Sequence, residues 1–239
     1  MIRLSRRLTA AASLVRPGSR LADIGTDHAY LPVSLLERDV CPFAVAADIN
    51  AGPLERASRT VAESGVGDRC ALLLTDGLCG VEAYAPDDVV IAGMGGELIA
   101  RIISEAPWTR SRALRLILQP MSRSEALREW LWENGYSILC ERLVTDDRLY
   151  EIFCVQWTGK RLPYTAAELL CGKLVPAGTP EERRTILEKR AAQLQRRIEG
   201  LRAAGKTAFP EEQALLEALR AIQYSWEETD ENHGDGKAN

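Results

Sequence analysis

Short runs of apolar residues alternate with longer amphipathic stretches through the first two-thirds of the chain. The apolar runs have the length of buried strands and occupy residues 20–24, 43–47, 70–74, 87–92 and 114–118. Apolar positions at helical spacing fill the intervening residues 31–38, 51–64, 96–106 and 122–134. Strands that alternate with helices pair in parallel through right-handed crossovers. The pattern therefore predicts a doubly wound α/β sheet.

The pattern changes after Gly135, where two strand-like runs follow each other directly. These runs, 137–144 and 149–157, flank a turn-forming Thr-Asp-Asp-Arg sequence, which predicts an antiparallel hairpin at the end of the sheet. By analogy of fold alone, such a sheet is typical of Rossmann-like class I methyltransferases.

The last third of the chain predicts helices only. Residues 160–180 contain three prolines and indicate a connection with one short helix. Beyond it, apolar residues follow coiled-coil spacing on both sides of a break at 204–210, at Leu187, Ala191, Leu194, Ile198 and Leu201 and at Leu215, Leu219, Ile222 and Trp226. We therefore expect an α/β domain over 1–159, a C-terminal α-helical coiled-coil hairpin over 160–226 and a disordered acidic tail over 227–239. The hairpin would serve as an RNA grip, a structural arm or a dimerisation element.

Composition narrows the class of protein. The chain is 46% hydrophobic and 27% charged, as in globular proteins, and no apolar stretch has the length of a membrane span. The basic N-terminus is weak as a signal peptide and fits an amphipathic first helix better, so we expect a cytoplasmic protein. Six cysteines without a CxxC pair and only two histidines predict reduced thiols and no metal site.

Positive charge is concentrated in two segments although the net charge is −4. Residues 1–20 contain five arginines and no acid, and residues 101–128 contain six arginines and two acids. A basic face on an acidic protein can bind a phosphate backbone, but solvated helix faces explain the same pattern equally well.

The turn after the first predicted strand carries the most chemical information. Ligands of doubly wound sheets bind beyond the carboxyl ends of the strands, where this turn lies. It contains Gly25 alone in place of the glycine-rich dinucleotide motif, and Asp27 would repel a pyrophosphate. Because S-adenosylmethionine has no phosphate and carries a sulfonium and an ammonium, acids such as Asp23 favour this cofactor over a nicotinamide dinucleotide.

Acids also follow the second and third predicted strands. Asp48, before Ile49, is placed to accept hydrogen bonds from both ribose hydroxyls, and Asp76, before Gly77, from an adenine amino group. Each acid alone is more often a cap or turn residue. Three acids at successive strand ends favour a nucleoside site.

The fourth strand ends in three glycines and a methionine, Gly93-Met94-Gly95-Gly96, which give bare backbone beside the expected methyl donor. A flat base could lie there, and a tight strand-to-helix turn is the equally simple explanation.

Several segments together resemble a known family. The motifs ADIGTDHAYLP, AADIN, TDGL, AGMGG and LILQP are similar to those of the TrmK family of bacterial tRNA (adenine-22-N1) methyltransferases, over roughly residues 3–157. The resemblance implies a Rossmann-like methyltransferase domain with a coiled-coil C-terminal domain, S-adenosyl-L-methionine as cofactor, tRNA as partner and methyl transfer to adenine N1. One departure is Met121, where the family often has asparagine.

The site residues expected from these arguments fall into three groups. The catalytic group is Asp27, Gly93 and Met94; the cofactor-binding group is Asp23, Gly25, His28, Asp48, Ile49, Asp76, Gly77 and Gly93; the tRNA-binding group is Arg3, Arg6, Arg7, Tyr30 and Gly95. For His28, the alternatives are a hydrogen bond to the base and a cap of the following helix. For Tyr30, the alternatives are stacking on a base and packing in the core. Two other functions stay open: methylation of a protein or small molecule, and a non-catalytic cofactor-binding assembly module.

Overall fold

The computed structural model describes residues 2–234, with side chains as far as Trp226. Its strands are β1 (Leu21–Ile24), β2 (Ala44–Asp48), β3 (Cys70–Leu74), β4 (Asp88–Gly95), β5 (Arg115–Ser122), β6 (Tyr136–Thr145) and β7 (Leu149–Trp157). Its α-helices are α1 (Arg6–Ala12), α2 (Tyr30–Glu37), α3 (Ala51–Glu63), α4 (Gly96–Ser104), α5 (Ser124–Glu133), α6 (Ala166–Cys171), α7 (Pro180–Ala203) and α8 (Pro210–Gly234). Short 3-10 helices η1 (Gly67–Arg69), η2 (Val81–Tyr84) and η3 (Pro107–Thr109) complete the elements.

The strands form one sheet in the order β3-β2-β1-β4-β5-β7-β6. The first five strands are parallel, and β7 pairs antiparallel with both β5 and β6. The chain crosses from β3 past β2 and β1 to β4, so the switch point of the sheet lies between β1 and β4. This arrangement confirms the predicted doubly wound sheet with its terminal hairpin.

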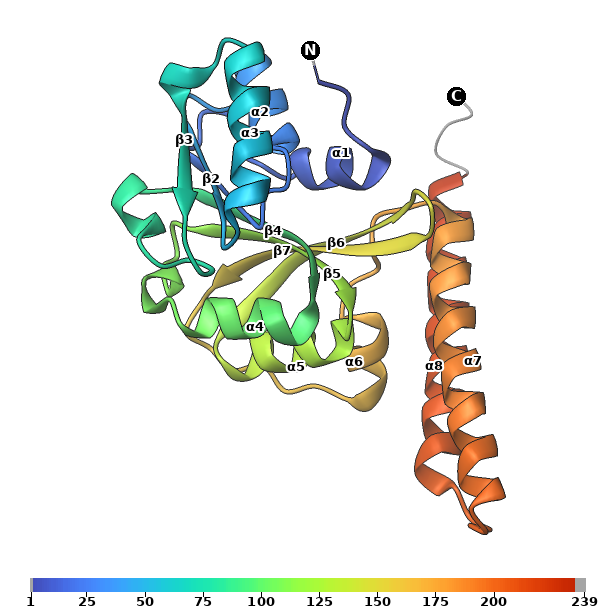
Figure 1. The fold of residues 1–239 in the computed structure, drawn as a ribbon. Coiled ribbons are helices and arrows are strands. Elements are labelled where there is room, and N and C mark those ends of the chain that lie inside the picture. The colour runs from blue at the N-terminus through green and yellow to red at the C-terminus, as the bar shows by residue number, and fades with distance from the viewer. Residues whose placement is uncertain (1, 235–239) are drawn as a thin grey trace.

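Two apolar layers cover the sheet. Helices α1, α2 and α3 lie over one face and α4 and α5 over the other (Figure 1). Side chains along β4 alternate between the layers, because Val89 and Ile91 pack with the α4 layer whereas Val90 packs with the α1 layer. Both faces are buried, which explains why the parallel strands are continuous apolar runs in the sequence.

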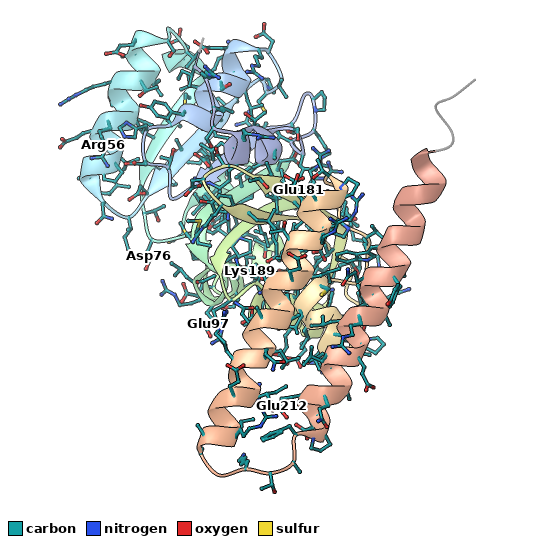
Figure 2. The ribbon with its side chains drawn as sticks, turned by 90° about the vertical axis from the view of Figure 1, so that its right-hand side faces the viewer. Arg56, Asp76, Glu97, Glu181, Lys189 and Glu212 are labelled. Carbon is teal, nitrogen blue, oxygen red and sulfur yellow. The ribbon has the colours of Figure 1, made fainter. Side chains whose placement is uncertain are left out.

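The C-terminal helices form the expected hairpin, which extends beyond the α/β domain (Figure 1). Its seam buries Leu187, Leu194, Leu219 and Trp226, and it also buries Ile186. Near the turn, where Glu212 of α8 is labelled in Figure 2, this carboxylate forms an ion pair with Arg197 of α7 at 3.3 Å between nitrogen and oxygen. None of the helices within residues 2–234 is long and apolar enough to cross a membrane.

One expectation at the C-terminus is wrong in part. Helix α8 continues to Gly234, through residues 227–234 of the segment that we expect to be disordered. The physical reason is that these residues contain neither proline nor an interior glycine, so nothing interrupts the helix before Gly234. Residues 235–239 of that segment lie outside the described residues.

A network of buried charges attaches α7 to the α/β domain. Arg128 of α5, only 1% exposed, donates to Glu141 of β6 and to Glu151 of β7, each at 2.6 Å. Arg190 of α7 donates to the second oxygen of Glu151 at 2.7 Å and to the Ser124 hydroxyl at 2.6 Å. Although burial alone would raise the pKa of Glu151, the two guanidinium groups hold it below its usual value. The four charges neutralise each other, so their burial is tolerated.

Removal of Glu151 is expected to destabilise the protein strongly. Glu151→Ala leaves two buried guanidinium groups with a single carboxylate, which should lower the free energy of unfolding by about 3–5 kcal/mol. Urea unfolding followed by circular dichroism measures this. The matched control is Asp39→Asn, which removes the charge of an exposed pair with Arg69 and should cost at most about 1 kcal/mol. Equal losses in both variants would contradict the role assigned to the network.

Candidate functional site

Two adjoining cavities open at the carboxyl ends of β1, β2 and β4. The larger, of about 340 Å³, is bordered by the ends of β1 to β4 and by the start of α4. The smaller, of about 230 Å³, is bordered by α1 and by the turn between β1 and α2. Both are lined by Gly25 and Ala92, so they form one continuous cleft at the switch point of the sheet.

Most residues of the expected cofactor group line the larger cavity. Gly25, Asp48, Ile49, Asp76, Gly77 and Gly93 are among its lining residues. The Asp48 carboxylate accepts the Asn50 backbone N–H through Oδ1 at 2.8 Å, and Asp76 faces Arg101 at 3.8 Å. Ile49 is 59% exposed although it is a large apolar residue, and Leu98 and Ile102 add further apolar surface. The cavity therefore combines carboxylate acceptors with apolar walls, the environment that a nucleoside requires.

Asp23 lies in the smaller cavity with Thr26, buried at the end of β1. Burial raises the pKa of Asp23 to about 6; the Thr26 hydroxyl opposes this shift and the nearby Asp48 adds to it. A buried carboxylate in this position gains from a cationic ligand, because the ligand compensates the cost of desolvation.

Gly25 is favoured by its backbone conformation and Gly96 is required by a close approach of backbone. Gly25 has φ +75°, and a Cβ there would overlap the Met94 methyl group. A Cβ on Gly96 would overlap the carbonyl oxygen of Arg123, so the starts of α4 and α5 touch through backbone. Strand β4 continues three residues beyond the expected end, and Met94 pairs with Pro120 through a local irregularity of register.

Asp27 and His28 stand at the rim of the smaller cavity. Asp27 forms an ion pair with Arg56 of α3, and His28 Nε2 lies 3.4 Å from the other Asp27 oxygen. The His28 ring stacks on Tyr30 with 4.9 Å between centroids, and Tyr30 is 43% exposed. The alternatives of a His28 helix cap and a Tyr30 core position are therefore wrong. The residue before α2 is Ala29, whose backbone N–H donates to the Thr26 hydroxyl.

The arginines of the N-terminus separate into two kinds. Arg3 and Arg6 are exposed, whereas Arg7 is partly buried and lines the smaller cavity. Arg7 Nη1 donates to Gln119 Oε1 at 2.6 Å, and the same oxygen accepts the Gly93 backbone N–H at 3.1 Å. Gln119 is not among the site residues expected from sequence; its signal is a polar residue that directly continues the apolar run of β5.

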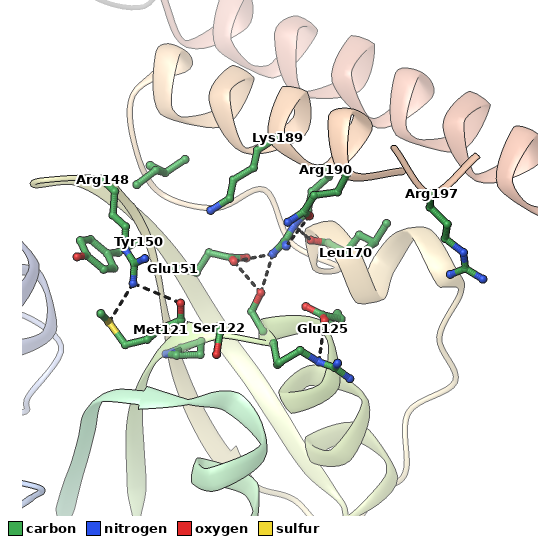
Figure 3. A pocket seen from close by; sticks show the side chains of 15 residues that line it. Met121, Ser122, Glu125, Arg148, Tyr150, Glu151, Leu170, Lys189, Arg190 and Arg197 are labelled. Atoms are coloured by element: carbon green, nitrogen blue, oxygen red, sulfur yellow. Dashed lines mark hydrogen bonds and ion pairs between the residues drawn. The ribbon is translucent and has the colours of Figure 1, made fainter. Parts of the chain in front are cut away.

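A separate groove of about 520 Å³ lies between the α/β domain and α7 (Figure 3). Its floor is the end of β5, at Pro120, Met121 and Ser122, beside the end of β4. Arg148 and Lys189 line it from opposite sides, and in the described chain neither forms an ion pair. Other cations of the lining are paired, as Arg190 is with Glu151 and Arg123 is with Glu97 and Glu125. The groove thus carries uncompensated positive charge.

Met121 lies between Gln119, beside the cleft, and Arg148, in the groove. Its sulfur lies 3.6 Å from Gln119 Nε2 and 3.6 Å from Arg148 Nη2. Arg148 and Arg7 both lie over the Tyr150 ring, with 5.0 Å and 5.4 Å from Cζ to its centroid. Among the side chains described, those of residues 2–226, no cluster of three or more histidine, cysteine or acidic groups has the geometry of a metal site.

Comparisons with known proteins agree with this geometry. A methyltransferase domain family matches residues 4–153. The tRNA (adenine(22)-N(1))-methyltransferase of Bacillus subtilis is 34% identical over 193 residues, which cover 80% of this chain and 81% of that protein. The structure of the B. subtilis m1A22 tRNA methyltransferase TrmK superposes with a TM-score of 0.77 at 29% identity and covers 96% of this chain and 100% of that chain.

A second solved structure contains the cofactor. It is that of Streptococcus pneumoniae Sp1610, described as a putative tRNA (m1A22) methyltransferase in complex with S-adenosyl-L-methionine. It is 30% identical, covers 93% of this chain and 100% of that chain, and has a TM-score of 0.77. With the cleft, the sheet and the matched domain in agreement, the chain belongs to the tRNA (adenine(22)-N(1))-methyltransferase family, whose cofactor is S-adenosylmethionine.

Proposed function

We propose that this protein transfers a methyl group from S-adenosylmethionine to N1 of adenine 22 in tRNA. The observation that carries the proposal is the position of the uncompensated basic groove, which adjoins the end of β4 at the edge of the cofactor cleft. The names of the related enzymes support the choice of substrate. A tRNA substrate also implies that the enzyme works in the cytoplasm.

The residues of the cleft fit the cofactor. Asp48 Oδ2 is available for the ribose hydroxyls because Oδ1 already accepts from Asn50. Ile49, Leu98 and Ile102 supply apolar contact for the adenine ring, and Asp76 supplies an acceptor at its edge. Gly25 lines both cavities, and the absence of its Cβ leaves room for the Met94 methyl group where the two cavities meet. The cofactor's ammonium then lies nearest to Asp23.

The chemistry at the base requires little from the protein. The bound cofactor supplies an electrophilic methyl group on a sulfonium. Neutral adenine N1 has an in-plane lone pair and attacks without a base, but the methylated ring becomes cationic. Asp27 is the carboxylate we assign to stabilise that charge, and its ion pair with Arg56 holds it at the rim of the cleft. Gly93, Met94 and Gly95 provide the surface against which the base lies, beside the exposed Tyr30 ring.

Access to N1 requires the target nucleotide to be unstacked and turned into the cleft. The backbone on either side must then be held nearby, and the groove offers Arg148 and Lys189 for its phosphates. A neutral small-molecule substrate would gain nothing from these two cations, and an assembly module would not need the cofactor cleft beside them.

The first test is methyl transfer to unmodified tRNA transcripts. Labelled S-adenosylmethionine should yield 1-methyladenosine at position 22, identified by nucleoside mass spectrometry and by mapping of the modified position. A transcript with guanine at position 22 is the control and should accept no label. If the protein binds the cofactor but modifies neither transcript, the proposed substrate is wrong.

A second prediction concerns the effect of the groove's cations on tRNA binding. Arg148→Ala and Lys189→Ala should each weaken tRNA binding about threefold to tenfold and reduce the slope of log affinity against log salt by about 1, because each removes one phosphate contact. Filter binding over a salt series measures both quantities. Arg38→Ala removes an exposed arginine outside the groove and should change neither. Cofactor affinity should be unaffected in all three variants, and an unchanged salt slope would contradict an RNA site in the groove.

The raised pKa of Asp23 predicts a pH-dependent affinity for the cofactor. Burial raises this pKa to about 6, so the carboxyl group is neutral at pH 5 and attracts the cofactor's ammonium only when it ionises. Affinity should therefore increase about tenfold from pH 5 to pH 7, as calorimetry can determine. Asp23→Asn should bind weakly with no such dependence. Asp48→Asn should also bind weakly but keep the dependence, and the same affinity of the wild type at both pH values would refute the assignment.

A further inference from the structure

The carboxylate of the cofactor has no partner among the acids of the cleft. The methionyl group of S-adenosylmethionine carries an ammonium and a carboxylate on one carbon atom, so a site that holds the ammonium beside Asp23 must also accept the carboxylate. A carboxylate inside a cleft requires a cationic or N–H donor close by, because an unpaired buried charge is costly. The cations that line the two cavities are therefore the candidates.

Arg7 is the candidate whose charge is not already compensated. It lines the same cavity as Asp23 and Thr26, the cavity at the end of the cleft away from the ribose acceptor Asp48. In the described chain its guanidinium forms no ion pair, since its hydrogen-bond acceptor is the neutral amide of Gln119. A partly buried cation with a neutral partner gains from a second, anionic one.

The other basic side chains of the cleft are engaged. His28 lies 3.4 Å from the Asp27 carboxylate and stacks on Tyr30. Arg101 lines the larger cavity, on the adenosine side, where it faces Asp76 at 3.8 Å and Glu105 at 3.5 Å. Neither can replace Arg7 without losing an acidic partner.

The Arg7 side chain is also held in place before any ligand binds. Nη1 donates to Gln119, whose side chain is fully buried, and the guanidinium lies over the Tyr150 ring. The Arg7 backbone N–H donates to Asp146 in the β6–β7 turn at 3.2 Å, which anchors the start of α1. A guanidinium held at one nitrogen keeps its remaining N–H groups for a second acceptor, and little side-chain entropy is left to lose on binding.

We infer that the Arg7 guanidinium binds the methionyl carboxylate of the cofactor, so Arg7 is a cofactor-binding residue and not one of the tRNA-binding arginines. Gln119 is then a positioning residue, because its Oε1 accepts from both Arg7 and the Gly93 N–H. This arrangement fixes the carboxylate relative to the end of β4, where the target base is expected. The inference rests on the proposed function only in its choice of cofactor.

The test compares two ligands that differ in the carboxylate alone. Calorimetry is carried out with S-adenosylmethionine and with decarboxylated S-adenosylmethionine, on the wild-type protein and on Arg7→Ala. We expect Arg7→Ala to weaken S-adenosylmethionine about tenfold to hundredfold, as for the loss of a charge-assisted hydrogen bond. Its affinity for the decarboxylated ligand should change less than about twofold, because that ligand has nothing for Arg7 to bind. Arg7→Lys should restore part of the difference.

Arg6→Ala is the matched control, since it removes the preceding, exposed arginine of α1, and it should bind both ligands as the wild type does. If Arg7→Ala weakens both ligands equally, Arg7 only supports the fold around Gln119 and the inference is overturned. Unchanged affinity for both ligands also overturns it. If the wild type binds neither ligand, the choice of cofactor in the proposed function fails instead. No tRNA enters this experiment, so its outcome is independent of the RNA substrate.

Discussion

The attachment of α7 to the α/β domain depends on the carboxylate of Glu151. One of its oxygens accepts from Arg128 of α5 and the other from Arg190 of α7, so a single side chain of β7 joins a helix of each domain. Arg190 also donates to the hydroxyl of Ser124, the first residue of α5. Because the basic groove lies between these same elements, the network sets the distance between its two walls. Charge compensation in the interior is therefore a condition for the surface on which we place the RNA.

Within the α/β domain, electrostatics divides the cleft along its length. Carboxylates stand at the ends of β1, β2 and β3, and Arg7 is brought to the opposite wall by α1. S-adenosylmethionine has the complementary pattern. Its ribose hydroxyls donate hydrogen bonds at one end, and its methionyl group carries an ammonium and a carboxylate at the other. An acidic cleft next to a basic groove also directs the RNA backbone, since a phosphate would be repelled from the first and attracted to the second.

The sequence predicts the sheet well because both of its faces are buried. Strand β3 has the expected bounds, β1 begins one residue later than expected, and β2 is shifted by one residue at both ends. Strands β4 and β5 extend further than expected because Gly93–Gly95 and Pro120–Ser122, which are turn-forming by composition, continue to pair with each other. The cofactor acids could be predicted because parallel strands bring their carboxyl ends to one edge.

The missed features depend on contacts between distant parts of the chain. The contact of Arg7 with Gln119 spans 112 residues and that of Arg190 with Glu151 spans 39. No local periodicity distinguishes a charged residue that turns inward from one that faces solvent. For this reason Arg7 is expected from sequence among the RNA-binding arginines. The hairpin is expected as one possible RNA grip, but the position of the basic groove between β5, β7 and α7 is not expected.

Because Gly96 closely approaches the Arg123 carbonyl, the two positions differ in the substitutions that they tolerate. Position 96 must remain glycine, because any side chain there would collide with backbone. At position 123 the close approach involves only the carbonyl group, which every amino acid has, so its side chain can vary, apart from proline and β-branched residues, which its φ of +56° disfavours. Arg123 lines the basic groove, whereas Gly96 starts the helix that follows the base-binding turn. Divergence among relatives can therefore retune the charge of the RNA-facing rim while the geometry of the methyl-transfer site stays constant.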